Sequence, residues 1–335
     1  MLLAELANLP GVSGGEKRVR QAIVEALAGC PVEMRTDNIG NLLVRKGPRR
    51  SPHVMLAAHM DEVGLMVVAI EKSGHLKFKP VGGIDSRVLA AKRVRVGAAA
   101  VPGVIGAKAV HLQKDDDRKK PYEIEDLFID IGAAGKEEAE ALVKIGDYAT
   151  FDTAATPIGS GFWRGKAFDD RAGCAVLLQL LRDPELTGFS AVFTVQEEIG
   201  SRGAITASYA LQPDRALIIE TTAAADTPGT GEDFSSTVLG AGPALSVMDR
   251  SVIVDREMLT ELIATAREAG LPFQFRRFTG GGTDAGAVAL AGEGVKTAVV
   301  STPCRYIHSP HSILKESDLQ ATAALVKAWL LRGER

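Results

Sequence analysis

The sequence predicts an α/β domain that is interrupted by a smaller β-rich insertion. Segments with helical or strand-like apolar patterns lie near both ends of the chain, whereas the stretch from Gly64 to about Phe151 consists of short β-like pieces broken by Gly and Pro. At 335 residues the chain exceeds the usual size of a single core. We therefore expect an α/β domain in two parts, residues 1–66 and 156–335, with a β-rich domain inserted at 67–155.

The first part of the α/β domain is predicted to contain a helix and two strands. Apolar residues recur at helical spacing over residues 16–28, and residues 41–46 and 53–58 have the short apolar runs of neighbouring strands.

The insertion is predicted to be a small β-barrel or β-sandwich. Residues 136–144 are its one clear helical piece. Its strand-like pieces are regularly broken by glycine, as in LKFKPVGGI, KRVRVGAAAVPGVIGA and LFIDIGA.

Longer elements return in the last part of the chain, which completes the α/β domain. We expect helices at 171–181, 252–268 and 318–331, with strands at 190–195 and 216–219.

Composition excludes several classes of protein. A net charge of −3 gives no electrostatic footprint for nucleic acid or an anionic membrane, and 46% hydrophobic residues is ordinary for a globular protein. No apolar run reaches membrane-spanning length, and the N-terminal segment lacks the basic start of a secretory signal, so we expect a cytoplasmic protein. Three widely spaced cysteines indicate neither a disulfide framework nor a thiolate metal site.

Carboxylates and histidines follow several of the apolar runs. Ligands of open α/β sheets gather at the carboxyl ends of the strands, so these side chains are expected to converge there. Together they are the residue types that a two-metal hydrolase needs: His59, Asp169, Glu197, Glu198, Glu220 and His308.

His59 and Asp61 fit the pattern of a metal-bound imidazole and its partner. A ligating histidine needs an acceptor for its second ring nitrogen, and a carboxylate two residues on can provide it. Taken alone, this motif is better explained by a histidine at a strand end whose ring nitrogens have ordinary hydrogen-bond partners. The other acids favour the metal site.

Glu197 and Glu198 follow a predicted strand as an adjacent pair. Neighbouring side chains in a strand point to opposite sides, so both can face one site only if the chain turns, as Ile199-Gly200 permits. One acid can then bind a metal while the other takes a proton from water. The pattern itself leaves the order of the two roles open.

The remaining candidates come from three segments. Asp169 precedes a predicted helix and is the candidate bridge between two metals, whereas Asp170 is interpreted as a helix cap. Glu220 ends an apolar strand, and a buried acid there needs a partner or a metal. Of His308 and His311, one is expected to be a ligand.

The glycine-rich segment TGGGTDAGA, residues 279–287, lacks the lysine of a phosphate-binding P-loop. A turn in which Thr283 caps a helix and Asp284 lies in its first turn explains it without a function. Close approach of its backbone to a substrate stays open as an alternative.

The ordered motifs resemble the tetrahedral, glutamyl-aminopeptidase-like family of dinuclear metallo-aminopeptidases. The resemblance spans nearly the whole chain and includes GGIDSR, PGVIGAKAVHL and LFIDIGA in the insertion. The strings that carry it in the α/β domain are AAHMDEVG, FDDRAGC, VQEEIGSRGA, ADTPG, GGTDAGA and RYIHSPHS.

This resemblance implies a mixed-sheet catalytic domain of the zinc-peptidase type and the removal of N-terminal residues from peptides. It implies that Glu197 is the general base and that a water bridges two divalent metals. Zn or Co is expected from the His and carboxylate ligands, with Mn as a third option. One metal would be held by His59, Asp169 and Glu220, and the other by Asp169, Glu198 and His308.

The resemblance also implies homo-oligomers, as dimers built into tetrahedral dodecamers through the inserted domain. One position departs from the family pattern, because this chain has Glu220 where many members carry Asp. The extra methylene affects metal preference and the position of the substrate amine.

Three other functions are alternatives to this one. A related dinuclear deacylase or carboxypeptidase would use the same residues and is separated by its response to a blocked N-terminus. A glycosidase with two carboxylates leaves both histidines unexplained. A non-catalytic binding module does not account for a complete ligand set beside a candidate base.

Overall fold

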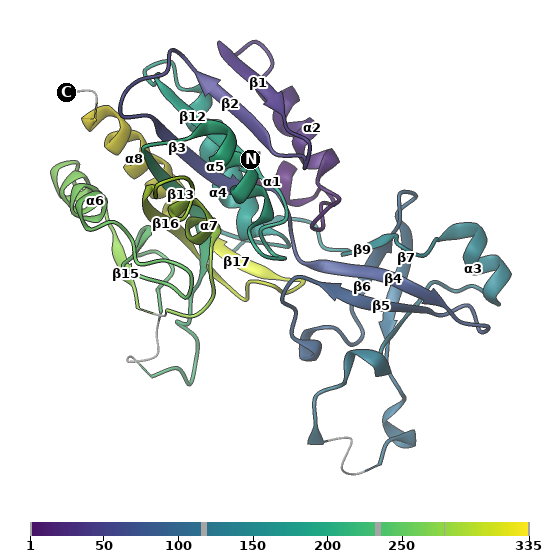
Figure 1. Ribbon diagram of the computed structural model, residues 1–335. Coiled ribbons are helices and arrows are strands. Elements are labelled where there is room, and N and C mark those ends of the chain that lie inside the picture. Colours follow the sequence, from purple (N-terminus) through teal and green to yellow (C-terminus); the bar gives the residue numbers. More distant parts are fainter. Residues whose placement is uncertain (1, 115–118, 232–235, 278, 334–335) are drawn as a thin grey trace.

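The computed structural model describes residues 2–114, 119–231, 236–277 and 279–333. Figure 1 shows a large α/β body and a β-rich part that extends from one side of it. The two parts are joined where β3 leads into β4 and where β9 leads into β10.

The α/β body is built on one mixed sheet, to which β14 (Ala244–Ser246) is added alongside β16, and β15 (Gln274–Arg276) alongside β14. Strands β12, β3, β13 and β16 at its centre run parallel, so their carboxyl ends lie at one edge of the sheet. In spatial order the sheet consists of β1 (Val32–Thr36), β2 (Leu42–Lys46), β12 (Phe189–Thr194), β3 (Val54–His59), β13 (Arg215–Ala223), β16 (Lys296–Arg305), β17 (Ser312–Lys315), β11 (Phe162–Gly165) and β10 (Thr156–Ile158).

Both faces of the central strands are buried. Alternate residues of β3 enter different cores, with Leu56 and Ala58 on one face and Met55 and Ala57 on the other. The second face packs against α5 (Arg202–Leu211) and α7 (Asp284–Ala289). The first face is covered by α1 (Leu2–Ala7), α2 (Lys17–Ala26), α4 (Phe168–Arg182), α6 (Arg256–Glu268) and α8 (Glu316–Arg332).

The inserted part is a closed barrel with its own apolar core. Of the two architectures predicted for it, the barrel is therefore correct. Helix α3 (Lys136–Leu142) packs on it, and short helical turns lie at 86–88, 110–112 and 124–126. Around the barrel the order is β4 (Gly64–Ile70), β5 (Leu76–Val81), β8 (Phe128–Asp130), β7 (Val101–Gly106), β6 (Arg93–Val96) and β9 (Tyr148–Phe151).

The predicted helices and strands are present, with bounds that differ by a few residues at several ends. The helix expected from residue 252 begins at Arg256, because Asp255 accepts a hydrogen bond from the Met258 amide as its N-cap. The helix expected from residue 171 begins at Phe168, with non-helical backbone at Asp169 and Asp170. This irregular entry carries the candidate bridging carboxylate.

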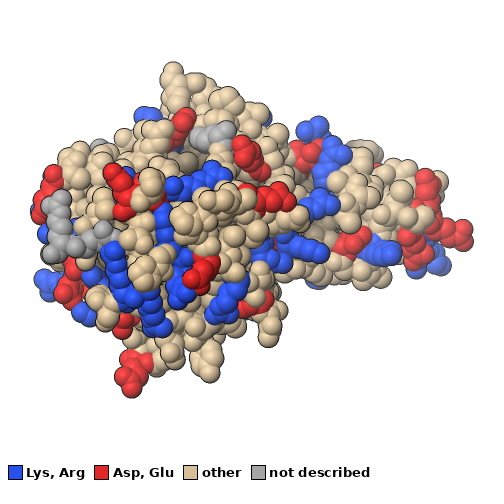
Figure 2. Space-filling view, turned by 90° about the horizontal axis from the view of Figure 1, so that it is seen from above, with Lys and Arg blue, Asp and Glu red and all other residues tan. Residues whose placement is uncertain are grey.

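The surface matches the mixed charge of the sequence. Figure 2 shows lysine and arginine side chains interspersed with acidic ones over the body and the barrel on this face. Within the described ranges, no helix is both long and apolar enough to cross a membrane.

Candidate metal centre

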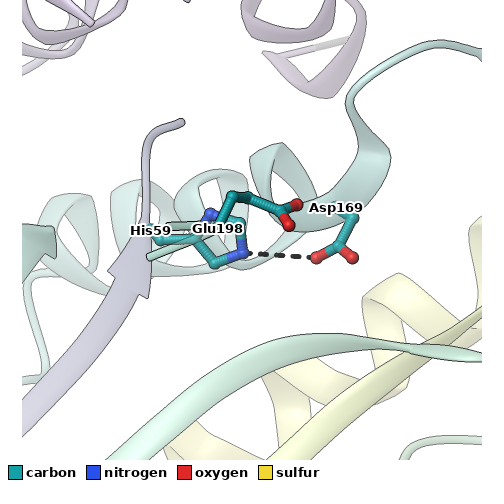
Figure 3. Close-up of side chains that lie close together, drawn as sticks. All are labelled: His59, Asp169 and Glu198. Carbon is teal, nitrogen blue, oxygen red and sulfur yellow. Dashed lines mark ion pairs between the residues drawn. The ribbon is translucent and has the colours of Figure 1, made fainter. Parts of the chain in front are cut away.

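The predicted site residues meet at the carboxyl edge of the central parallel strands. His59 is the last residue of β3, Glu220 lies near the end of β13, and Glu197 follows β12 by three residues. His308 follows β16 by three residues, and Asp169 comes from the irregular entry of α4. Figure 3 shows Asp169 and Glu198 close to the ring of His59.

Asp169 lies between the two histidines. Its Oδ1 is 3.3 Å from His59 Nε2, and its Oδ2 is 3.2 Å from His308 Nε2. Each oxygen of one carboxylate therefore faces a different imidazole (Figure 3 shows the His59 side). This arrangement suits a carboxylate that bridges two cations.

A second carboxylate accompanies each histidine. Glu220 Oε1 is 3.3 Å from His59 Nε2, and Glu198 Oε1 is 3.2 Å from His308 Nε2. Two ligands of a tetrahedral metal, each about 2.1 Å from it, are roughly 3.4 Å apart. The observed separations fit that spacing on both sides of Asp169.

The other ring nitrogens of the histidines are held by the protein. His59 Nδ1 is 3.2 Å from the Asp61 carbonyl oxygen and 3.4 Å from Asp61 Oδ1. His308 Nδ1 is 2.9 Å from the carbonyl oxygen of Gly83, which belongs to the inserted part. These contacts leave both Nε2 atoms facing the acids, as metal ligation requires.

Asp61 also fixes the turn that carries the acidic pair. Its Oδ1 accepts a hydrogen bond from the Glu197 amide at 3.0 Å, and its Oδ2 accepts one from the Glu198 amide at 3.1 Å. The chain turns at Gln196, with a φ of 57°, and at Gly200, with a φ of 114°. This turn allows two adjacent acids to face one site, as the Ile199-Gly200 sequence predicted.

Asp170 behaves as the predicted cap. Its Oδ1 accepts hydrogen bonds from the Gly173 amide at 2.9 Å and from Thr221 Oγ1 at 3.1 Å. It also lies close to His59 and Glu220, so the three have donor atoms within 4.8 Å of one another. His311, by contrast, is exposed and is not part of either group of potential ligands among the described residues.

Burial shifts the proton affinities of these acids. It raises the pKa of Glu220 to about 7, although the charge of His59 opposes the shift. Burial likewise raises the pKa of Glu197 well above its usual range. The charge of His59 opposes this shift, and the charge of Glu220 adds to it. Burial would also raise the pKa of Asp169, but contacts with His308 and His59 hold it below its usual range.

The donor set fits divalent cations. Asp169 Oδ1 and Glu198 Oε1 are buried and find no well-formed hydrogen bond in the described part of the chain. Unpaired buried carboxylate oxygens are costly, and a cation compensates them. The negative charge gathered around two imidazoles favours the same ligand. The acids concerned are Asp61, Asp169, Asp170, Glu197, Glu198, Glu220 and Asp284.

The glycine-rich segment has the predicted cap and the predicted first-turn acid, but the burial of this acid was not foreseen. Thr283 Oγ1 accepts a hydrogen bond from the Ala285 amide at the start of α7. Asp284 is 1% exposed, and its Oδ2 accepts a hydrogen bond from Thr194 Oγ1 at 2.5 Å. Burial raises the pKa of Asp284 to about 6.

A buried ion pair beneath the site was also not foreseen. Lys166 Nζ lies 2.8 Å from both carboxylate oxygens of Glu62, next to Asp61 in the chain. The fully buried Arg171 donates from Nε to the Met60 carbonyl oxygen at 2.7 Å. Lysine and arginine are seldom fully buried, so only their position beside the HMD and FDDR motifs could have indicated this role.

Known proteins resemble the chain along nearly its full length. A family model described as M42 glutamyl aminopeptidase matches residues 40–325. The solved TET aminopeptidase of a marine sediment archaeon, a member of the Thaumarchaeota, is 37% identical, with 99% of this chain and 95% of that chain covered and a TM-score of 0.95.

Two proteins of the genus Pyrococcus are similar as well. The Pyrococcus horikoshii TET1 peptidase, which can assemble into a tetrahedron or a large octahedral shell, is 34% identical over 97% of each chain with a TM-score of 0.86. The lysyl aminopeptidase of Pyrococcus furiosus is 32% identical over 98% of this chain and 96% of its own length. The family model spans most of the chain and the relatives cover nearly all of it, and the chain therefore belongs to the M42 glutamyl aminopeptidase family of peptide hydrolases.

Proposed function

We propose that this aminopeptidase removes N-terminal residues from peptides with two divalent metal ions and with Glu197 as its general base. The observation that carries the proposal is Asp169, whose two oxygens face two different histidines at 3.3 and 3.2 Å. One metal would be held by His59, Asp169 and Glu220. The other would be held by Asp169, Glu198 and His308.

The reaction depends on charge and on proton transfer. Two such ions would polarise the scissile carbonyl and lower the pKa of the attacking water, whichever of Zn, Co or Mn is bound. Glu197 accepts the proton of the water and delivers it to the leaving amine. Burial raises the pKa of Glu197, which favours its role as the group that takes the proton.

Asp61 supports this chemistry without touching the substrate. Its carboxylate receives the amides of Glu197 and Glu198, and its carbonyl oxygen orients the ring of His59. Asp61 therefore holds the proposed base and two proposed metal ligands, Glu198 and His59, in fixed positions relative to one another. Such support around metal ligands tunes both metal affinity and geometry.

The main alternative is a deacylase or carboxypeptidase that uses the same residues. The family match and the lysyl aminopeptidase relative favour cleavage at a free N-terminus. A deacylase would instead hydrolyse substrates with a blocked amine. Aminoacyl chromogenic substrates and their N-acetylated counterparts distinguish the two.

Removal of metal should abolish hydrolysis. We expect exhaustive chelation to remove activity on a panel of aminoacyl substrates, and addition of Zn or Co to restore it, because bound metals would polarise the substrate carbonyl and lower the pKa of the attacking water. Elemental analysis checks that the stripped protein is free of metal. Full activity of the metal-free protein would contradict the proposed mechanism.

We further propose that this chain forms a homo-oligomer, as the relative that can assemble into a tetrahedron does, and that the inserted barrel mediates it. Several apolar side chains of the insertion are exposed, including Val110 at 62%, Leu112 at 61% and Ile145 at 66%. Exposed apolar groups on this domain would be covered by a partner in an assembly. The boundaries of this domain, 67–155, are part of the same proposal.

The mass in solution should exceed that of the 35.4 kDa chain and should depend on the barrel surface. We expect Ile145→Asp to lower the mass measured by light scattering, because it places a charge in an apolar contact. Lys144→Ala is the control, since it removes no apolar surface. A fully active monomer at all working concentrations would refute the assembly while leaving the proposed chemistry intact.

A further inference from the structure

We propose that Glu16, supported by Ser13, is a positioning residue that holds the turn of residues 196–198 in the geometry needed for catalysis. Both residues lie on the segment that precedes α2, far from the acidic pair in sequence. The proposal rests on the function proposed for Glu197. It adds a residue that the sequence motifs of the site did not include.

Buried carboxylates accept hydrogen bonds from three successive backbone amides of the turn, those of residues 196–198. Glu16 Oε1 accepts a hydrogen bond from the Gln196 amide at 3.1 Å. Asp61 accepts those of Glu197 and Glu198 at 3.0 and 3.1 Å. The start of the turn is thus held by Glu16 and its end by Asp61.

The side chain of Glu16 turns away from its own helix. Glu16 occupies the N-cap position of α2, yet its carboxylate makes no capping bond there. Instead, Oε1 receives the Gly14 amide at 2.7 Å as well as the Gln196 amide. The residue is only 4% exposed, so burial raises the pKa of its carboxyl. A buried carboxylate in this place is expected to have a specific partner.

Ser13 joins the same segment to Asp61. Its Oγ donates to Asp61 Oδ2 at 2.6 Å, and both residues are buried. The segment is itself anchored, because the Glu62 amide donates to the Gly11 carbonyl oxygen and the Gly11 amide donates to Glu62 Oε1. The N-terminal segment therefore fixes the positions of both carboxylates that hold the turn, those of Glu16 and Asp61.

The turn needs this support because of its backbone. Gln196 has a φ of 57°, a conformation that non-glycine residues adopt only when their surroundings enforce it. Loss of the Glu16 bond frees the amide of that residue directly before the general base. A displacement of about 1 Å in a reacting group can cost roughly 10²-fold in rate. The effect should therefore appear in turnover.

The test compares Glu16→Ala and Glu16→Gln in the intact protein. Glu16→Ala should lower kcat by about 10-fold or more, with KM within about threefold and metal content unchanged. Glu16→Gln should recover most of the lost kcat, because its amide oxygen can still accept the Gln196 amide. Glu25→Ala is the matched control, since Glu25 is exposed on the same helix and bonds only locally to Gln21.

Three results would overturn the proposal: an unchanged kcat in folded Glu16→Ala, a kcat that falls in step with metal content, or Glu16→Gln as slow as Glu16→Ala. If Glu16→Ala does not fold, Ser13→Ala provides the same comparison through Asp61, with the same expected loss in kcat. Failure of the proposed function is detected separately. It would appear as metal-independent activity of the unaltered protein.

Discussion

Glu197→Gln should retain both metals and bind substrate normally while its turnover falls by about 10²-fold or more. This is the usual scale of general acid–base catalysis, and the amide cannot accept the proton of the water. The side chain keeps its shape, and its backbone amide still donates to Asp61. We expect kcat to fall while KM stays nearly constant, as measured by steady-state kinetics.

Glu198→Gln is the matched comparison, because it makes the same change at the neighbouring position. Glu198 Oε1 lies 3.2 Å from His308 Nε2, so its loss should weaken one metal. Excess metal should then partly restore the activity of this variant but not that of Glu197→Gln. If Glu197→Gln loses a metal while Glu198→Gln keeps both, the two roles are reversed.

The strands that carry the site were predictable because they are buried on both faces. Strands β3, β12 and β13 are parallel and central, and each contains an apolar run followed by a polar residue. The edge strands lack this pattern. In β1, for example, four of the five residues are exposed, so no alternation marks it as a strand.

The ligand candidates were predictable for a related reason. A carboxylate or histidine directly after an apolar strand has a position fixed by the sheet, and parallel strands bring such positions to one edge. The order of Glu197 and Glu198 could not be obtained this way. It depends on how the chain turns at Gln196, and therefore on bonds from Glu16 and Asp61.

The residues that support the site from outside the motifs could not be predicted from the sequence. Glu16 reaches a turn 180 residues away, and Lys166 pairs with Glu62 across 104 residues. In the sequence these residues appear as ordinary surface charges, because burial of a charge depends on a partner that only the fold supplies. The burial of Asp284 was missed for the same reason, since a place in the first turn of a helix explained this acid in the sequence.

Asp169→Ala should remove both metals and nearly all activity. The substitution deletes the two oxygens that lie 3.3 Å from His59 and 3.2 Å from His308, so neither group keeps its full set of donors. Loss of the polarising cations is worth several kcal/mol, or roughly 10³-fold in turnover. Elemental analysis of metal per subunit, beside turnover on an aminoacyl substrate, is the measurement.

Asp170→Asn is the control, because Asp170 is the adjacent carboxylate and is buried. Its Oδ1 already receives the Gly173 amide and the Thr221 hydroxyl, and an asparagine oxygen can keep both bonds. This variant should therefore retain two metals per subunit. Loss of only one metal in Asp169→Ala would show that Asp169 is not the bridge. Loss of a metal in Asp170→Asn as well would place Asp170 among the ligands, beside His59 and Glu220, which are near enough to share one.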